Sequence, residues 1–420
     1  MSAVLTRTFD SLRVRNYRLF FSGQVISWTG TWVAWVAQGW LVLEITGSGF
    51  GLGVVTALQW LPVLLFGAWG GVLADRFDKR KLLILTNVSS AALSLVLGVL
   101  TVSGIVELWM VVVIALLLGV LTAVDNPTRQ TFTMEMVGRE RLTNAVSLNT
   151  ATFTTARVIG PAVAGFLIAG VGIGECFLVN AASFAPVTIA LLVMDKSQLR
   201  TSDPVAQKPG QVREGFRYAL STPVLRTILI IMSIVGMLQY NFQVILPVLA
   251  KNTFAGDATT LGLLGAALGV GMFVGSIAHA ALGRPTRRVL LSAGFALGGM
   301  TLLVAAAPSV WSAALLMIPL GSASMAFLAT MNSSLQLNSS DAMRGRVMAM
   351  YFVLFLGSTP IGAPIIGWVA ETFDPRAALG LGGLATLVAC TYGYVKLPEM
   401  SGVWSEEADT AGDLVTEQER

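Results

Sequence analysis

The strongest constraint on this chain is a series of twelve apolar runs, each close to or above the roughly 20 residues that a helix needs to cross a bilayer. In the first half the runs lie near Leu19–Leu43, Leu52–Leu73, Leu82–Ser103, Leu108–Val124, Ala145–Val171 and Phe177–Met194. In the second half they lie near Val224–Ala250, Leu261–Leu282, Val289–Ala307, Trp311–Met331, Val347–Glu371 and Ala377–Val395. Lipid offers backbone polar groups no hydrogen-bond partner, and the runs lack the alternation of barrel strands. We therefore predict an all-α membrane protein with twelve transmembrane helices.

The composition excludes several classes of protein. Only 12% of the residues are charged and 55% are hydrophobic, whereas an ordinary soluble domain carries about 25% charged residues. This balance excludes a soluble enzyme, a nucleic-acid binder and a disordered chain. The chain has a single histidine, His279, which excludes a histidine-based metal cluster. It also lacks the GxxxxGK[ST] loop that would indicate an ATPase. We expect no metal and no cofactor.

The basic residues predict the orientation of the chain. If both termini lie in the cytoplasm, all but three of the 27 Lys and Arg residues fall in cytoplasmic segments. Lys251 and Arg376 fall in outer loops, and Arg157 falls within a run. Short cytoplasmic loops of membrane proteins carry such an excess of positive charge.

Polar segments and an internal repeat predict the domain organisation. The segments are an N-terminal six-helix bundle, a cytoplasmic linker, a C-terminal six-helix bundle and an acidic cytoplasmic tail, over residues 1–194, 195–222, 223–397 and 398–420. In the linker, Val212, Phe216 and Leu220 are spaced for one face of a short helix lying on the inner leaflet. Glycines such as Gly160 and Gly362 recur at an offset of about half the chain, which is typical of transporters built from two related halves.

The loop after the second run carries the most specific motif. It reads Gly71-Val72-Leu73-Ala74-Asp75-Arg76-Phe77-Asp78-Lys79-Arg80. This loop resembles the major facilitator superfamily signature G-x-x-x-D-[RK]-x-G-[RK]-[RK], with Asp78 in place of the usual glycine. Gly275 and His279 stand where a second, altered copy of the motif is expected. The resemblance implies the major facilitator fold.

Two further segments, Asp125–Gln130 and Ala156–Gly165, narrow the resemblance. They are similar to the exporter branch that includes enterobactin-type siderophore exporters, macrolide-efflux proteins and drug:proton antiporters. The resemblance implies export of an amphipathic drug or siderophore in exchange for protons, by a monomer in the bacterial cytoplasmic (inner) membrane. The alternatives are uptake, a lipid or lysolipid transporter of the same fold, a non-transporting scaffold and an integral-membrane enzyme. No nucleophile–base pair supports the last.

The motif residues have two possible roles. The resemblance implies a conformational latch made of Gly71, Asp75, Arg76, Lys79 and Arg80, in which the Asp75 loop holds the outward-open state against the start of the eleventh run. A carboxylate is stabilised at a helix N-terminus, which makes such a latch physically reasonable. The alternative is that the basic residues only set the orientation.

Charged residues near or within the runs are candidates for coupling and gating. Asp125 is the leading proton carrier and Glu44 the second, although Glu44 could simply be an outer-edge residue. An isolated charge within a span costs on the order of 2.5–3.5 kcal/mol on insertion scales, so Arg157 should face a cavity or a partner. There it could anchor an anionic substrate group, tune a carboxylate or bind backbone carbonyls. Gly160 and Pro161 predict a kink that takes part in gating.

Polar and aromatic residues on one face of the first run predict a substrate cavity. These residues are Gln24, Trp28, Thr31, Trp35 and Gln38. The second half adds Gln239, Tyr240, Asn241 and Tyr351. Such a mixture suits an amphipathic aromatic ligand. The alternatives are ordinary packing, or tryptophans that face lipid near an interface.

Overall fold

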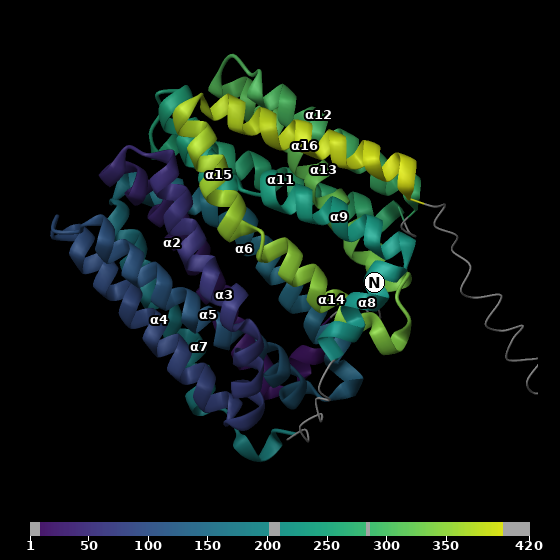
Figure 1. The fold of residues 1–420 in the computed structure, drawn as a ribbon. Coiled ribbons are helices and arrows are strands. Elements are labelled where there is room, and N and C mark those ends of the chain that lie inside the picture. The colour runs from purple at the N-terminus through teal and green to yellow at the C-terminus, as the bar shows by residue number, and fades with distance from the viewer. Residues whose placement is uncertain (1–8, 201–210, 283–285, 398–420) are drawn as a thin grey trace, which may run out of the picture.

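The chain is helical throughout its described regular structure, in agreement with the prediction (Figure 1). The computed structural model describes residues 9–200, 211–282 and 286–397, so the predicted acidic tail (398–420) and part of the linker lie outside the described residues. The first half contains η1 (Asp10–Arg13), α2 (Arg15–Thr46), α3 (Gly49–Arg76), α4 (Lys79–Val102), α5 (Leu108–Val137), η2 (Arg139–Arg141), α6 (Leu142–Gly170), α7 (Ile173–Val193) and η3 (Lys196–Gln198).

The second half has the same alternation of long helices and short turns. It contains α8 (Gln211–Ser221), α9 (Pro223–Leu238), α10 (Phe242–Val248), η4 (Leu249–Thr253), α11 (Ala258–Leu282), α12 (Arg287–Ala305), α13 (Val310–Leu337), α14 (Asp341–Leu356), α15 (Thr359–Thr372) and α16 (Pro375–Lys396).

Within the described ranges, 11 segments are long and apolar enough to cross a membrane. They correspond to every predicted run except the first. That run forms α2, which has 32 residues but carries Gln24, Ser27 and Gln38 among its buried side chains. Because these polar groups lie inside the protein, α2 can be long without being uniformly apolar.

Two predicted runs are interrupted rather than continuous. The seventh breaks between α9 and α10, where the Asn241 side chain donates to the Met237 carbonyl at 2.6 Å. The eleventh breaks between α14 and α15, where Gly357 is followed by Pro360 in the first turn of α15. Proline lacks a backbone N–H and disfavours helix in the residue before it. Hydropathy alone does not reveal either break.

The packing of the helices repeats between the halves. In the first half α3 packs on α5, α4 on α7 and α2 on α7, and in the second half α11 packs on α13, α12 on α16 and α9 on α16. The main contacts between the halves join α3 to α15 and α6 to α11. The internal repeat seen in the glycine pattern therefore has a structural counterpart.

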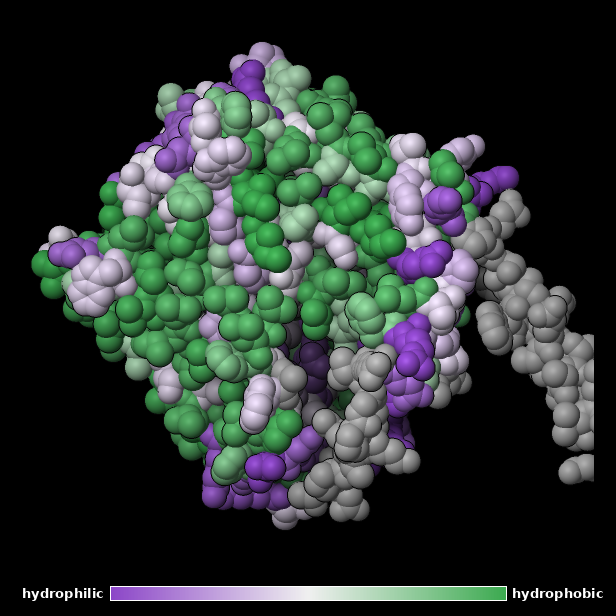
Figure 2. Space-filling model, viewed as in Figure 1, coloured by the Kyte–Doolittle hydropathy of each residue, from purple (hydrophilic) through white to green (hydrophobic). Residues whose placement is uncertain are grey.

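The outer surface matches a bilayer environment. Hydrophobic residues cover the middle of the face in Figure 2, and hydrophilic residues gather toward the ends of the helices. Large apolar side chains such as Phe166, Trp311 and Leu315 are exposed. Exposed apolar area on this scale requires a partner surface, which hydrocarbon supplies.

The linker contains the expected short helix, α8. The side chains of Phe216 and Leu220 are exposed, and the placement of this helix on the inner leaflet stays a prediction. Glu214 forms an ion pair with Arg346 of α14 at 2.7 Å, and the Tyr218 hydroxyl accepts the Ser340 N–H at 3.1 Å. These contacts attach α8 to the start of α14.

Two adjacent glycines of α3 should differ sharply in their tolerance of a methyl group. A Cβ on Gly70 would lie 2.0 Å from the Ala123 carbonyl oxygen of α5, whereas a Cβ on Gly71 would meet nothing within 4 Å. We expect Gly70→Ala to destabilise the protein by about 1–3 kcal/mol, because the helices must separate. Gly71→Ala should leave stability unchanged or raise it. Equal thermal unfolding midpoints for the two purified variants would contradict this packing.

Candidate functional site

A central cavity of about 1890 Å³ lies between the two halves. Residues of α2, α3, α5 and α6 line it from the first half, and residues of α10, α11, α13 and α14 from the second. It extends to the helix ends near Asp75, Arg139 and Gln336, which we call the mouth end. Figure 2 shows a hollow with hydrophilic atoms at depth between α3 and α14.

The opposite ends of the helices close the cavity, and we call them the closed end. A Cβ on Gly165 of α6 would lie 2.6 Å from the Cα of Gly262 in α11. A Cβ on Gly367 of α15 would lie 2.3 Å from the Gly49 carbonyl oxygen of α3. Backbones can approach this closely only where small residues meet.

A carboxylate also joins the halves at the closed end. Glu371, near the end of α15, accepts hydrogen bonds from the Ser48 hydroxyl and from the Phe50 N–H, the latter at 2.9 Å. Ser48 is the N-cap of α3. The Glu371 carboxylate therefore occupies the N-terminus of α3, where unpaired N–H groups favour negative charge.

The inner part of the cavity is aromatic on both sides. On the first half, Trp32 and Trp35 have ring centroids 4.8 Å apart, and Trp35 lies 5.7 Å from Trp60. On the second half, Tyr240 lies 5.2 Å from Phe355. Such edge-to-face clusters form walls suited to flat apolar groups.

Most of the predicted cavity residues lie on this cavity, and two do not. The cavity-lining ones are Trp28, Thr31, Trp35, Gln38, Arg157, Tyr240, Asn241 and Tyr351. Gln24 is fully buried away from the cavity, without a hydrogen-bond partner among the described residues. Gln239 is also buried and donates to Thr301 of α12 at 2.7 Å. Helical spacing identified the face of α2 but not how far along it the cavity extends.

The predicted kink residues lie where α6 meets other helices. Pro161 is inside α6, and its ring is the nearest group to a Cβ placed on Gly265 of α11, at 2.6 Å. A Cβ on Gly160 would lie 2.4 Å from the Cβ of Trp32. Both residues therefore stand at close contacts of α6, one with the other half and one with α2.

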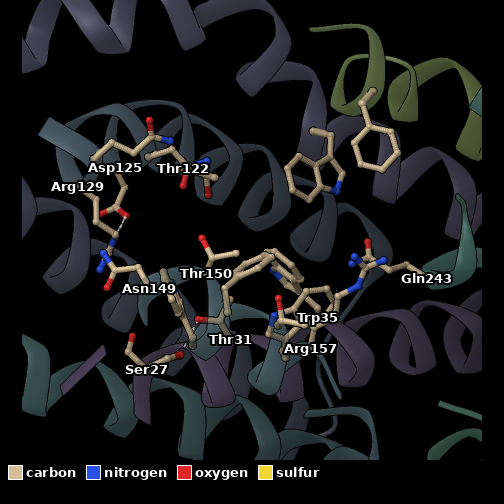
Figure 3. Close-up of a pocket in the computed structure, with 18 of the residues that line it drawn as sticks. Ser27, Thr31, Trp35, Thr122, Asp125, Arg129, Asn149, Thr150, Arg157 and Gln243 are labelled. Atoms are coloured by element: carbon tan, nitrogen blue, oxygen red, sulfur yellow. Dashed lines mark hydrogen bonds and ion pairs between the residues drawn. The ribbon is translucent and has the colours of Figure 1, made fainter. Parts of the chain in front are cut away.

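Asp125 lies on the cavity wall as half of an ion pair. Arg129 donates to its Oδ2 from Nε at 2.8 Å and from Nη2 at 2.6 Å, and Thr86 donates to its Oδ1 at 2.7 Å. Figure 3 shows this pair on one side of the cavity and Trp35 and Arg157 on the other.

The residues of the signature loop have separate surroundings. Lys79 forms an ion pair with Glu135 of α5 at 2.7 Å. The Arg80 guanidinium donates to the carbonyls of Leu191 and Leu192 at the end of α7. Both basic residues thus tie α4 to its own half.

The other three predicted latch residues are Gly71, Asp75 and Arg76. Asp75 is exposed at the mouth end and has no hydrogen bond or ion pair with a described residue, and Arg76 is also exposed. Gly71 has open space beside it. The described structure therefore brings no part of this loop against the start of α14.

Glu44 lies outside the cavity near the closed end. It is exposed and accepts the Trp40 indole N–H at 2.8 Å. Lys251 of η4 lies over the Trp40 ring at 5.7 Å.

Several charged residues with clear partners were absent from the predicted site, among them Arg129, Glu135 and Glu371. Arg129 follows Asp125 by one helical turn, so the i,i+4 spacing could have identified it. Glu135 and Glu371 meet partners 56 and 323 residues away in the sequence, and no local pattern predicts such contacts.

An all-helical membrane protein whose halves enclose a polar and aromatic cavity, open toward one end, has the architecture of a solute transporter. The sequence agrees with this class. The profile of the transmembrane secretion effector family matches residues 6–418, and the chain belongs to that family of the major facilitator superfamily. It is therefore a transporter and not an enzyme.

Characterised relatives cover nearly the full chain. The staphyloferrin A transporter of Staphylococcus aureus is 26% identical over 377 residues, which are 88% of this chain and 93% of the relative. The multidrug efflux pump Tap of Mycolicibacterium fortuitum is 28% identical over 359 residues, or 81% and 86% of the two chains. The enterobactin exporter EntS of Escherichia coli is 24% identical over 384 residues, or 89% of each.

Solved structures share the fold at low identity. A bacterial homologue of the lysosomal transporter Spinster, in an inward-facing and unoccupied conformation, has a TM-score of 0.67 at 14% identity and covers 92% of this chain and 95% of its own. The nucleoside transporter NupG has a TM-score of 0.69 at 13% identity, covering 91% and 98%.

The Lys79–Glu135 pair should stabilise the first half. Both side chains are nearly buried, with exposed fractions of 12% and 8%. Removing one partner of a buried pair leaves an uncompensated charge and costs about 3–5 kcal/mol. We expect Lys79→Gln and Glu135→Gln each to lose about this much unfolding free energy in mixed micelles. The double variant should lose less than the sum, because the two sites interact. Additive losses would show that the pair is not coupled.

Proposed function

We propose that the protein is a secondary transporter that exports an amphipathic organic solute, a drug or siderophore, in exchange for protons by alternating access. The observation that carries the proposal is the central cavity, which is lined by both halves, open at the mouth end and closed at the other. The curated relatives that export siderophores or drugs support the direction of transport. A proteoliposome flux assay with an imposed pH gradient tests it, and flux without pH dependence would refute antiport.

The proposal includes a topology of twelve spanning helices in two bundles, residues 1–194 and 223–397, with both termini cytoplasmic. The 11 apolar segments and α2 together supply twelve. The predominance of basic residues at the mouth end supports a cytoplasmic mouth. The protein then works as a monomer in the bacterial cytoplasmic (inner) membrane, because one chain supplies a complete cavity.

We assign proton coupling to the Asp125–Arg129 pair. Asp125 is the carboxylate on the cavity wall that is held by a guanidinium and a hydroxyl, and its side chain is 17% exposed. Protonation of Asp125 would remove the charge that holds Arg129, whose Nη1 already lacks a partner in the described structure. Arg129 would then be free to take a new position when the transporter changes state.

Asp125→Asn should uncouple transport from the proton gradient. The amide cannot bind and release a proton, so we expect uphill export to fall by at least tenfold while exchange of labelled for unlabelled solute continues. Glu44→Gln is the matched control and should retain uphill export, because Glu44 lies outside the cavity. Both fluxes are measured in proteoliposomes. If Glu44→Gln uncouples and Asp125→Asn does not, the assignment reverses.

For alternating access, we propose two carboxylate contacts between α3 and the span formed by α14 and α15. One contact lies at the closed end and the other at the mouth end. At the closed end, Glu371 of α15 binds the N-terminus of α3. At the mouth end, Asp75 near the end of α3 would bind the N-terminus of α14 in the outward-open state, as the family resemblance implies. Because α14 and α15 form one span, one contact can form only when the other opens.

Substitutions at the two carboxylates should shift the protein in opposite directions. Glu371→Gln weakens the closed end and should favour the outward-open state, whereas Asp75→Asn should favour the inward-open state. The reporter is Gln243→Cys, at an exposed cavity position, in a background where the buried Cys176 and Cys390 are alanine.

An impermeant maleimide added outside intact cells measures the shift. Relative to the Gln243→Cys protein alone, its rate of reaction with the introduced thiol should rise severalfold when Glu371→Gln is added. The rate should fall when Asp75→Asn is added. Unchanged rates in both variants, or undiminished transport by Asp75→Asn at normal expression, would rule out the paired contacts.

A lysolipid is the second candidate substrate. The hollow between α3 and α14 lies on the apolar face seen in Figure 2, so a solute could enter the cavity from the inner leaflet. Including a lysolipid beside a macrolide and a catecholate siderophore in the flux assay separates the two candidates.

A further inference from the structure

Arg157 is a half-buried cation that no acidic group of the described structure neutralises. It lies within α6, lines the cavity, and forms no ion pair or hydrogen bond with a described residue. Its Cζ lies 5.7 Å from the centroid of the Trp32 ring. Three carboxylates line the cavity: Asp75, Asp125 and Glu140. Asp125 is paired with Arg129, and Glu140 is paired with Arg200.

The immediate surroundings of Arg157 are hydrogen-bond donors and aromatic rings. The Trp32 side chain is 8% exposed, and its indole N–H has no acceptor among the described residues. Tyr240 already donates its hydroxyl proton to the Ser324 carbonyl at 2.9 Å. The Arg157 guanidinium and the Trp32 indole N–H are therefore donors without an anionic acceptor among the described residues. A bound anion would satisfy both groups.

The location of Arg157 also suits recognition of a substrate. The next residue along α6, Val158, packs against Gly269 of α11. Tyr240 and Tyr351, from the second half, line the same cavity as Arg157. An anion bound here would therefore contact both halves beside the α6–α11 contact that changes during alternating access.

We propose that Arg157 and the aromatic residues around it form a subsite for a carboxylate carried on a flat apolar body. A guanidinium binds a carboxylate through two parallel hydrogen bonds, and this interaction is stronger away from bulk water. The Trp32–Trp35 and Tyr240–Phe355 walls would hold the apolar part. The binding of such a ligand is independent of the proposed function. Only the statement that this ligand is the transported solute rests on the proposed function.

Three naphthalene derivatives with the same ring and different charge test the subsite. Binding of 2-naphthoate, 2-naphthamide and 2-naphthylmethylammonium to the purified protein in nanodiscs is measured by equilibrium dialysis, with empty nanodiscs as the blank. We expect the wild type to bind the carboxylate about tenfold or more tightly than the amide, the usual effect of a charge-assisted hydrogen bond. The ammonium should bind most weakly.

The variants identify the residue responsible. Arg157→Gln should bind the acid and the amide equally, and Arg157→Lys should keep only part of the preference, because a lysine has the charge without the fork. Arg13→Gln is the matched control, since Arg13 is exposed and pairs with Asp10 outside the cavity. Arg157→Lys also keeps the test valid if the glutamine variant does not fold.

Two results would overturn the subsite: equal binding of acid and amide by the wild type, or full carboxylate preference in a folded Arg157→Gln. The outcome is separable from that of the proposed function. Carboxylate-selective binding without proton-dependent flux would refute only antiport, and antiport without any selectivity for charge would refute only the subsite.

Discussion

The absence of hydrogen-bond partners in lipid is the constraint on which this structure depends. It requires every spanning backbone group to bond within the chain, which helices achieve. It also moves polar side chains inward, where Gln38 meets Gln59 across α2 and α3 at 3.1 Å and Gln239 meets Thr301. The polar cavity is a consequence of the same constraint, because polar groups that face lipid on one side of α2 would be too costly.

The same constraint determines how the two halves can separate. Apolar burial gives little drive to associate when the alternative is lipid, so contact between helices relies on close packing of small residues and on a few polar bonds. At the closed end these are the glycine contacts of α6 with α11 and α3 with α15, and the Glu371 carboxylate. Such an interface is narrow and can open without exposing a large core, whereas the ion pairs of Lys79 and Arg129 lie within one half.

The sequence predicted the fold better than the site. Apolar runs, basic loops and the signature around Asp75 identified a helical transporter of the superfamily, because these features depend on local composition. The breaks in the seventh and eleventh runs were not predicted, since Asn241 and Pro360 act through backbone hydrogen bonding rather than hydropathy. The bond between Glu371 and the start of α3 joins residues 323 positions apart and required the tertiary structure.

The central claim is that the two ends of the cavity open in alternation. Spin labels at Val146 and Leu337 report the mouth end, and labels at Val171 and Thr259 report the closed end, all four positions being exposed. Double electron–electron resonance distances in nanodiscs, recorded as pH and transported solute are varied, measure both ends directly. The account predicts that the mouth-end distance shortens as the closed-end distance lengthens. Distances that stay fixed under every condition, or that lengthen together, would contradict it.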